Sequence, residues 1–139
     1  MNTKLAGNTL IIRLKPGDEI LESIGAACRE NGIVCGYVTG IGASDDAVVG
    51  CFSREKKDYT DREYTGDMEI CSLVGNITQK DGAIFPHLHI TLAREDGVIV
   101  GGHLKRAVIS LTAEIFISST DCVINRKYCK NTGIYVFDI

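Results

Sequence analysis

The chain has 139 residues and a mass of 15.1 kDa, which leaves room for one hydrophobic core and excludes two separate catalytic domains. Hydrophobic residues make up 45% of the sequence and charged residues 24%, a balance typical of a globular chain rather than a disordered or fibrous one. The net charge of -3 has the wrong sign for a surface that coats DNA phosphates. We therefore expect a single domain over residues 1–139.

A short strand and a helix are the first elements expected along the chain. Residues 8–15 are rich in β-branched and apolar side chains and end at Pro16-Gly17, which predicts a strand followed by a break. Residues 19–31 carry apolar side chains at helical spacing and end at Asn31-Gly32, a C-terminal stop signal. We expect Asp18 to cap this helix and its apolar stripe to pack on a sheet.

The remaining sequence predicts mostly strands separated by turn residues. Their short connections favour antiparallel pairing, because a parallel crossover needs a dozen residues or more. We therefore predict an α+β fold, with one main helix packed on a large, mainly antiparallel β-sheet. The expected strands cover residues 33–41, 47–53, 58–64, 68–79, 87–94, 98–104, 108–118 and 134–137.

The cysteines indicate a cellular compartment rather than a disulfide framework. They form no Cys-x-x-Cys pair, and residues 1–15 lack the pattern of a secretory signal, so we expect a reducing cytoplasm. We expect free, small core residues, with a metal or redox role for one of them as the alternative. No apolar run approaches the roughly 18 residues of a membrane span, so no membrane partner is expected. The cysteines are Cys28, Cys35, Cys51, Cys71, Cys122 and Cys129.

The three histidines of the chain lie close together in the sequence, at His87, His89 and His103. His87 and His89 are two residues apart on an expected strand, so both imidazoles leave the same face, about 6.6 Å apart. Glu95-Asp96-Gly97 has the composition of a three-residue hairpin loop, and that loop places His89 directly across from His103. Both rings could then ligate one metal ion. The sequence therefore predicts a three-histidine metal site, with hydrogen-bonding histidines on a partly exposed sheet face as the alternative.

One acidic residue, Glu114, lies within the apolar run of residues 110–118. An unpaired carboxylate is costly to bury, so we expect Glu114 to meet a cation, a histidine or an oligomer partner. A short turn at Lys105-Arg106 would place it on the face of His103, as a candidate base or as a group that orients a ligand. Three neutral imidazoles with one open position form the site of a zinc hydrolase or lyase, which keeps an enzyme among the hypotheses.

At these residues the chain resembles the plants-and-prokaryotes conserved (PPC) domain family, in its stand-alone prokaryotic form. The resemblance implies an α+β domain built on an antiparallel sheet, and a homotrimer as in the prokaryotic members. It rests on three segments in the family's order, VTGIGASDDAVVGCF at 38–52, YTGDMEICSLVGNIT at 64–78 and PHLHITLAREDGVIVGGHLKRAVISLTAEIFI at 86–117.

The resemblance also matches individual residues of this chain to positions of the family's motifs. His87, His89 and His103 match the family's histidines, which in some members bind a metal such as zinc. Gly101-Gly102 match the glycine pair before the third histidine. The family's acidic positions are matched by Glu69 and Glu114.

DNA binding is the weaker part of what the resemblance implies. In plants the domain follows an AT-hook, a short Arg-Gly-Arg-Pro segment that enters the minor groove, and this chain contains no such segment. Its basic clusters, at residues 54–57 and at Arg126-Lys127 with Lys130, are short and are interpreted as solvated loops. DNA stays a candidate partner that no basic segment of this chain supports.

Two functions follow as hypotheses. The first is a cytoplasmic, homotrimeric PPC-domain protein that binds zinc through its three histidines as a binding or regulatory module. The alternative is a zinc-dependent lyase or hydrolase that acts on a small carbonyl or carboxylate substrate, with Glu114 or Glu69 as catalytic residues. The architecture is similar to that of acetolactate decarboxylase, a three-histidine zinc lyase, which supports the alternative by fold analogy only. A third hypothesis is a trimeric platform for protein interactions, in which the metal is incidental.

Overall fold

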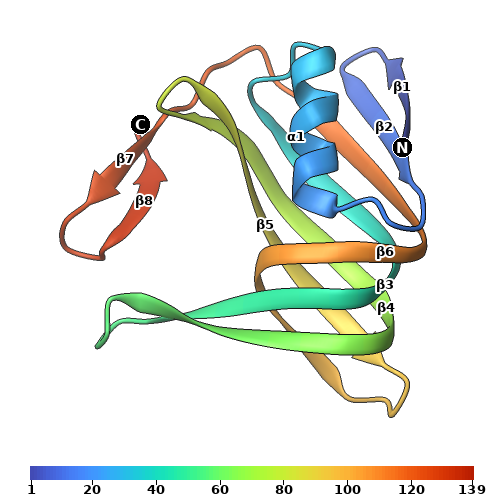
Figure 1. The fold of residues 1–139 in the computed structure, drawn as a ribbon. Helices are drawn as coiled ribbons and strands as arrows, with labels where there is room; N and C mark the ends of the chain where they lie inside the picture. The colour runs from blue at the N-terminus through green and yellow to red at the C-terminus, as the bar shows by residue number, and fades with distance from the viewer.

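A computed structural model describes residues 1–139 as eight strands and one helix (Figure 1). Six strands form one sheet in the order β1-β2-β6-β3-β4-β5, all paired antiparallel, and β7 and β8 form a separate hairpin. The predicted α+β fold is confirmed. The elements are β1 (Asn2–Ala6), β2 (Thr9–Leu14), α1 (Ile20–Glu30), β3 (Gly36–Ser53), β4 (Asp58–Lys80), β5 (Ala83–Arg94), β6 (Ile99–Ser119), β7 (Arg126–Cys129) and β8 (Ile134–Phe137).

The strands β3, β4 and β6 are longer than the sequence pattern predicts. Each joins two expected strands into one, and the expected turn at Lys105-Arg106 does not form, because β6 passes through it. The chain bends at register shifts instead, between Gly40 and Gly42 and between Ser44 and Asp46 on β3. Bulges of this kind bend a strand without ending it. The long curved strands in Figure 1 result from these shifts.

The curvature lets β6 pair with three other strands. Its first residues pair with β5, its middle with the second half of β3, and its last residues with β2 and the first half of β3. The strands β6, β3, β4 and β5 therefore form a closed circuit of pairings. This circuit brings the start of β6, which carries His103, against β5, which carries the other two histidines.

The helix α1 begins one residue later than predicted and packs on β2, β5 and β6. Its N-cap is Glu19, whose carboxylate accepts hydrogen bonds from the backbone N–H groups of Glu22 and Ala107. Asp18, the expected cap, instead accepts from the Lys15 N–H and pairs with the N-terminal ammonium group 2.8 Å away. The helix is too short to cross a membrane, and it is the only helix of the structure.

One hydrophobic core lies between α1 and the inner face of the sheet. On β5 the side chains of Leu88, Ile90 and Leu92 are buried in it. Because side chains alternate along a strand, His87 and His89 project from the opposite face. The core therefore fixes the face on which both histidines lie.

The cysteine prediction is half right. All six are free, as expected, but only Cys28 and Cys35 belong to the buried interior. Cys51 and Cys71 lie on exposed positions of β3 and β4, and Cys122 and Cys129 belong to the C-terminal segment. The alternation of strand side chains places half of any long strand outside the core, which the local composition around the cysteines does not reveal.

Candidate metal centre

The hairpin between β5 and β6 has the predicted register. The Arg94 N–H donates to the carbonyl of Val98 over 3.0 Å, and Gly97 adopts a left-handed conformation with φ 79°. This loop pairs His89 directly with His103. Opposed side chains of an antiparallel pair lie on one face of the sheet, so the third histidine joins the other two.

The glycine pair before His103 allows three strands to meet at this point. A Cβ on Gly102 would lie 2.8 Å from the carbonyl oxygen of Gly50 on β3, and a Cβ on Gly101 would overlap the carbonyl oxygen of Ile90 on β5. Real Cβ atoms do not approach backbone oxygens so closely. The two glycines therefore hold β6 between its neighbours and position the ring of His103.

The three imidazole rings converge. Their ring centroids lie 5.1 to 5.6 Å apart, and each residue offers one ring nitrogen within 4.8 Å of the other two. Ligand nitrogens around a tetrahedral zinc ion lie about 3.4 Å apart, as follows from zinc–nitrogen distances of about 2.0–2.1 Å. Small side-chain rotations would close the cluster to that spacing.

Two of the histidines lie in surroundings that keep them neutral. Partial burial lowers the pKa of His87 to about 4, with smaller contributions from the positive charges of Arg126 and His89. Partial burial also lowers the pKa of His103 to about 4, assisted by the neighbouring His87 and Lys105. Both imidazoles are therefore unprotonated at neutral pH, which is the form that ligates metals.

His103 also carries a polar atom without a partner. Its Nδ1 is buried and makes no hydrogen bond. Buried polar atoms in folded proteins are nearly always hydrogen-bonded, and a cation beside the ring would satisfy a nitrogen lone pair equally well. The donor set of three imidazoles suits zinc. These residues therefore fit the metal that the resemblance implies.

A fourth side chain, Arg126 of β7, reaches the cluster. Its Nη2 donates to Nδ1 of His87 over 3.1 Å and to the Asn76 side-chain oxygen over 2.8 Å. Its Nε donates to the Thr78 hydroxyl over 2.9 Å. The interpretation of this basic segment as a solvated loop is wrong at Arg126, because β7 packs against β4 and turns the guanidinium inward. Only this tertiary contact reveals the role of Arg126.

The cluster opens into a pocket of about 280 Å³. His87 and His103 line it, together with Arg126, Lys105 and Tyr59. The Tyr59 ring packs on the ring of His103 at 4.9 Å, and Lys105 Nζ lies 3.8 Å from the centre of the Tyr59 ring. Residues of the β3–β4 hairpin and of the β7–β8 hairpin thus both line a cavity beside the histidines.

The two acidic candidates lie together, but in another pocket. Glu69 and Glu114 line a cavity of about 410 Å³, with Ile41 and Leu111. Neither carboxylate lines the histidine pocket. Glu114 is exposed and lies directly across the β2–β6 pair from Arg13, without forming an ion pair with it, and it does not line the pocket of the histidines.

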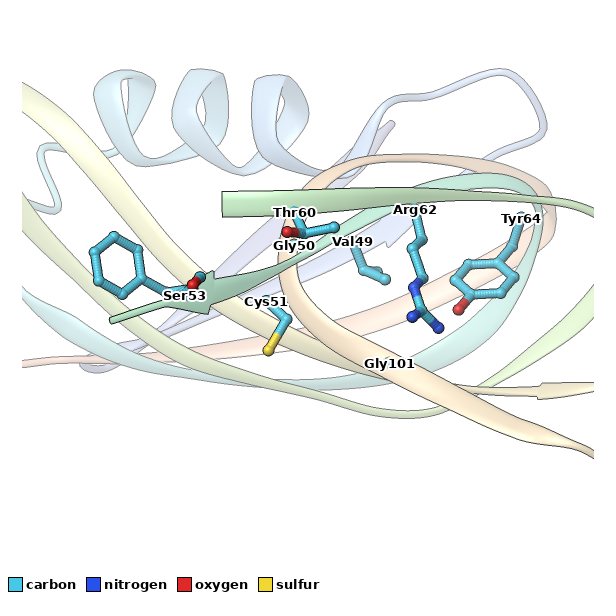
Figure 2. Close-up of a pocket in the computed structure, with 9 residues that line it drawn as sticks. Val49, Gly50, Cys51, Ser53, Thr60, Arg62, Tyr64 and Gly101 are labelled. Atoms are coloured by element: carbon cyan, nitrogen blue, oxygen red, sulfur yellow. The ribbon is translucent and has the colours of Figure 1, made fainter. Parts of the chain in front are cut away.

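Another pocket, of about 440 Å³, lies along the hairpin formed by β3 and β4 (Figure 2). Arg62 is its only charged lining residue, and Cys51 and Tyr64 lie on either side of it in the view. No histidine and no carboxylate line this cavity. It therefore lacks the convergent titratable groups that mark the histidine pocket as the better functional candidate.

Comparisons with known proteins agree with the fold. A PPC protein from Pyrococcus horikoshii is 34% identical, with a TM-score of 0.88 over 99% of this chain and 95% of its own. A metal-containing protein from Archaeoglobus fulgidus is 30% identical, with a TM-score of 0.87 over 99% and 98%. A candidate DNA-binding protein from Bacteroides thetaiotaomicron is 32% identical, with a TM-score of 0.94 over 99% and 96%. No curated protein matches the sequence.

The family comparison completes the assignment. The model of the Plants and Prokaryotes Conserved (PCC) domain, which we abbreviate PPC, matches residues 1–121. The match contains all three histidines and both acidic positions, and it ends before β7, which carries Arg126. The chain therefore belongs to the plants-and-prokaryotes conserved domain family.

Proposed function

We propose that this protein binds one zinc ion per chain through His87, His89 and His103, and that it acts as a homotrimeric binding or regulatory module. The convergence of the three imidazoles, whose ligand nitrogens lie within 4.8 Å of one another, carries the proposal. The unpartnered Nδ1 of His103 and the low pKa values of two of the rings support it. The metal-containing relative from Archaeoglobus fulgidus shares this fold at 30% identity.

An exposed apolar surface supports the trimer. Phe116 on β6 and Val74 on β4 both pair with Thr39 of β3, so they share one outer face of the sheet. Ile41 is 59% exposed and Leu111 70% exposed, and both line the pocket of Glu114. Contiguous apolar surface of this kind is characteristic of subunit interfaces. Glu114 lines the same pocket and is the direct cross-strand partner of Arg13 on β2.

The zinc proposal is tested by titrating protein without a histidine tag against a chromophoric zinc chelator. We expect about one zinc per chain in the parent and none in the double variant His87→Ala, His89→Ala. The control is Thr91→Ala, which alters the same face of β5 next to His89 and keeps all three imidazoles. Equal zinc in the parent and the double variant would contradict the proposal.

A second candidate function is a zinc-dependent lyase or hydrolase that acts on a small carbonyl or carboxylate substrate. The observation in its favour is the pocket of about 280 Å³ beside the histidines, where polar groups converge as they do in ligand sites. Glu69 and Glu114 are the catalytic candidates, and because they line a different pocket, they could act only from a neighbouring subunit or after a rearrangement. Loss of turnover in Glu114→Gln with zinc retained would favour the enzyme.

DNA binding is a third candidate function, because the relative from Bacteroides thetaiotaomicron is a candidate DNA-binding protein. The net charge of -3 opposes it. A band-shift series over salt tests whether this protein binds DNA, because phosphate contacts weaken steeply as salt rises. The absence of a shifted band at low salt would remove DNA from the proposed function.

A further inference from the structure

The histidine pocket carries more positive charge than its metal site requires. Arg126, Lys105 and Lys57 line it, against the single carboxylate of Asp58. None of the three cations forms an ion pair with a carboxylate. A chain with a net charge of -3 thus gathers unpaired cations at one cavity.

Arg126 is the best placed of these cations. All its partners are neutral: the Thr78 hydroxyl, the Asn76 amide oxygen, Nδ1 of His87 and the Tyr135 carbonyl. The rings of Phe85 and Phe137 lie 5.0 Å from the guanidinium carbon. A partly buried arginine held by neutral groups keeps its full charge available for an anion.

The contact between Arg126 and His87 has a chemical consequence. Arginine only donates hydrogen bonds, so Nδ1 of His87 is the acceptor and its lone pair is used. A neutral imidazole has one such lone pair. A metal ion on His87 would displace Arg126 from that ring. On Nδ1 the ion would take the same lone pair, and on Nε2 it would leave the proton on Nδ1, which then cannot accept from Arg126.

Displacement by a metal would give Arg126 a second free donor. Of its five N–H groups, four are used in the hydrogen bonds above, which leaves one on Nη1. Loss of the His87 contact frees a second on Nη2. Two free N–H groups on neighbouring nitrogens match the two oxygens of a carboxylate or phosphonate.

We infer that the pocket beside the three histidines binds a small organic oxyanion, which Arg126 recognises with help from Lys105. The aromatic rings of Tyr59 and Phe85 supply an apolar wall for the remainder of the ligand. The volume of about 280 Å³ limits that remainder to about one ring. Two-point recognition by Arg126, and with it the strengthening of this site by the metal, rests on the proposed zinc function, whereas weaker recognition through its one free N–H group and the charges of Arg126 and Lys105 does not.

The test uses saturation-transfer NMR with benzoate and phenylphosphonate, with benzyl alcohol as the neutral control. We expect at least one of the two anions to bind zinc-loaded protein about tenfold or more tighter than metal-free protein, and benzyl alcohol to bind neither form. Arg126→Gln lowers the affinity for that anion about tenfold or more, and the matched variant Arg54→Gln leaves it unchanged. The preferred anion identifies the oxyanion group.

Zinc binding is measured on the same samples, with circular dichroism as the check that the variants fold. Arg126→Gln should bind zinc as tightly as the parent or tighter, because it lacks a competitor for His87. Lys105→Met keeps an aliphatic chain over Tyr59 and provides a second folded variant. It should lower the affinity for the anion by a smaller factor than Arg126→Gln does. If neither anion binds any form, or if Arg126→Gln binds as the parent does, the inference is wrong. If zinc does not bind but metal-free protein binds an anion through Arg126, the zinc proposal alone fails.

Discussion

His89 and His103 are direct cross-strand partners, and this pairing depends on a point where three strands meet without side chains between them. Gly102 lies against the backbone of Gly50, and Gly101 against that of Ile90. The position of the metal centre is thus set by backbone packing as much as by the histidines.

Substitution of Gly102 by Ala should disturb both the fold and the metal site. The added Cβ would lie 2.8 Å from the Gly50 oxygen, so β6 must shift. We expect a loss of about 1–3 kcal/mol in the free energy of unfolding and weaker zinc binding. Urea denaturation and the zinc titration measure the two effects.

The control for this variant is Gly25→Ala in α1. Its added Cβ meets only the flexible end of Arg29, and Ala stabilises a helix interior by up to about 1 kcal/mol over Gly. The account of the strand junction is wrong if Gly102→Ala matches the parent in stability and zinc affinity.

His103→Phe should abolish zinc binding without destabilising the metal-free protein. The unpartnered Nδ1 of His103 costs the metal-free protein about 1 kcal/mol or more, and Phe removes that atom while keeping a ring against Tyr59. We expect the metal-free variant to be as stable as the parent or more stable, with its zinc affinity lost. A clearly destabilised metal-free variant would show that the nitrogen has a partner in solution.

The stability of the metal-free protein should fall on acidification between pH 6.5 and pH 4. The pKa values of His87 and His103 are about 4 in the folded protein and about 6.5 when the chain is unfolded, so only the unfolded chain takes up protons in this range. Above pH 6.5 both imidazoles are neutral in the folded and in the unfolded chain, so this loss of stability is absent there. The urea midpoint should decline less between pH 7.5 and pH 4.5 in the double variant His87→Gln, His103→Phe than in the parent. Equal declines would show that these two histidines do not cause the loss of stability.

The apolar outer face should hold the subunits together. We expect light scattering to give three times the chain mass for the parent, and a smaller mass for Phe116→Asp, because a charge at this half-exposed position cannot be buried without a partner. Lys130→Asp, on the exposed C-terminal hairpin segment, is the matched control and should remain trimeric. A monomeric parent would remove the trimer from the proposed function.

The histidine register was predictable from the sequence because it depends on local features. The loop at Glu95-Asp96-Gly97 fixes the pairing, and the period of two along β5 fixes the face of His87 and His89. The helix was predictable for the same reason, since its apolar spacing and its stop at Asn31-Gly32 are both local.

The long strands and Arg126 depend instead on contacts between distant residues. The bend of β3 between Ser44 and Asp46 occurs at a bulge whose partners on β6 are more than sixty residues away, as in the hydrogen bond from the Ser44 hydroxyl to the Val108 carbonyl. Arg126 reaches His87 because β7 packs on β4, which no composition or spacing of residues 120–131 indicates. The separation of Glu114 from the histidines has the same origin, since β6 continues where a turn was expected.

The zinc K-edge X-ray absorption spectrum of the zinc-loaded, untagged protein tests the central claim most directly. Imidazole nitrogen and thiolate sulfur ligands differ in distance, at about 2.0–2.1 Å and about 2.3 Å. We predict a shell at the nitrogen distance with the multiple-scattering features of three imidazoles. A sulfur shell from the exposed cysteines, or a spectrum unchanged in His87→Ala, His89→Ala, would contradict the three-histidine site.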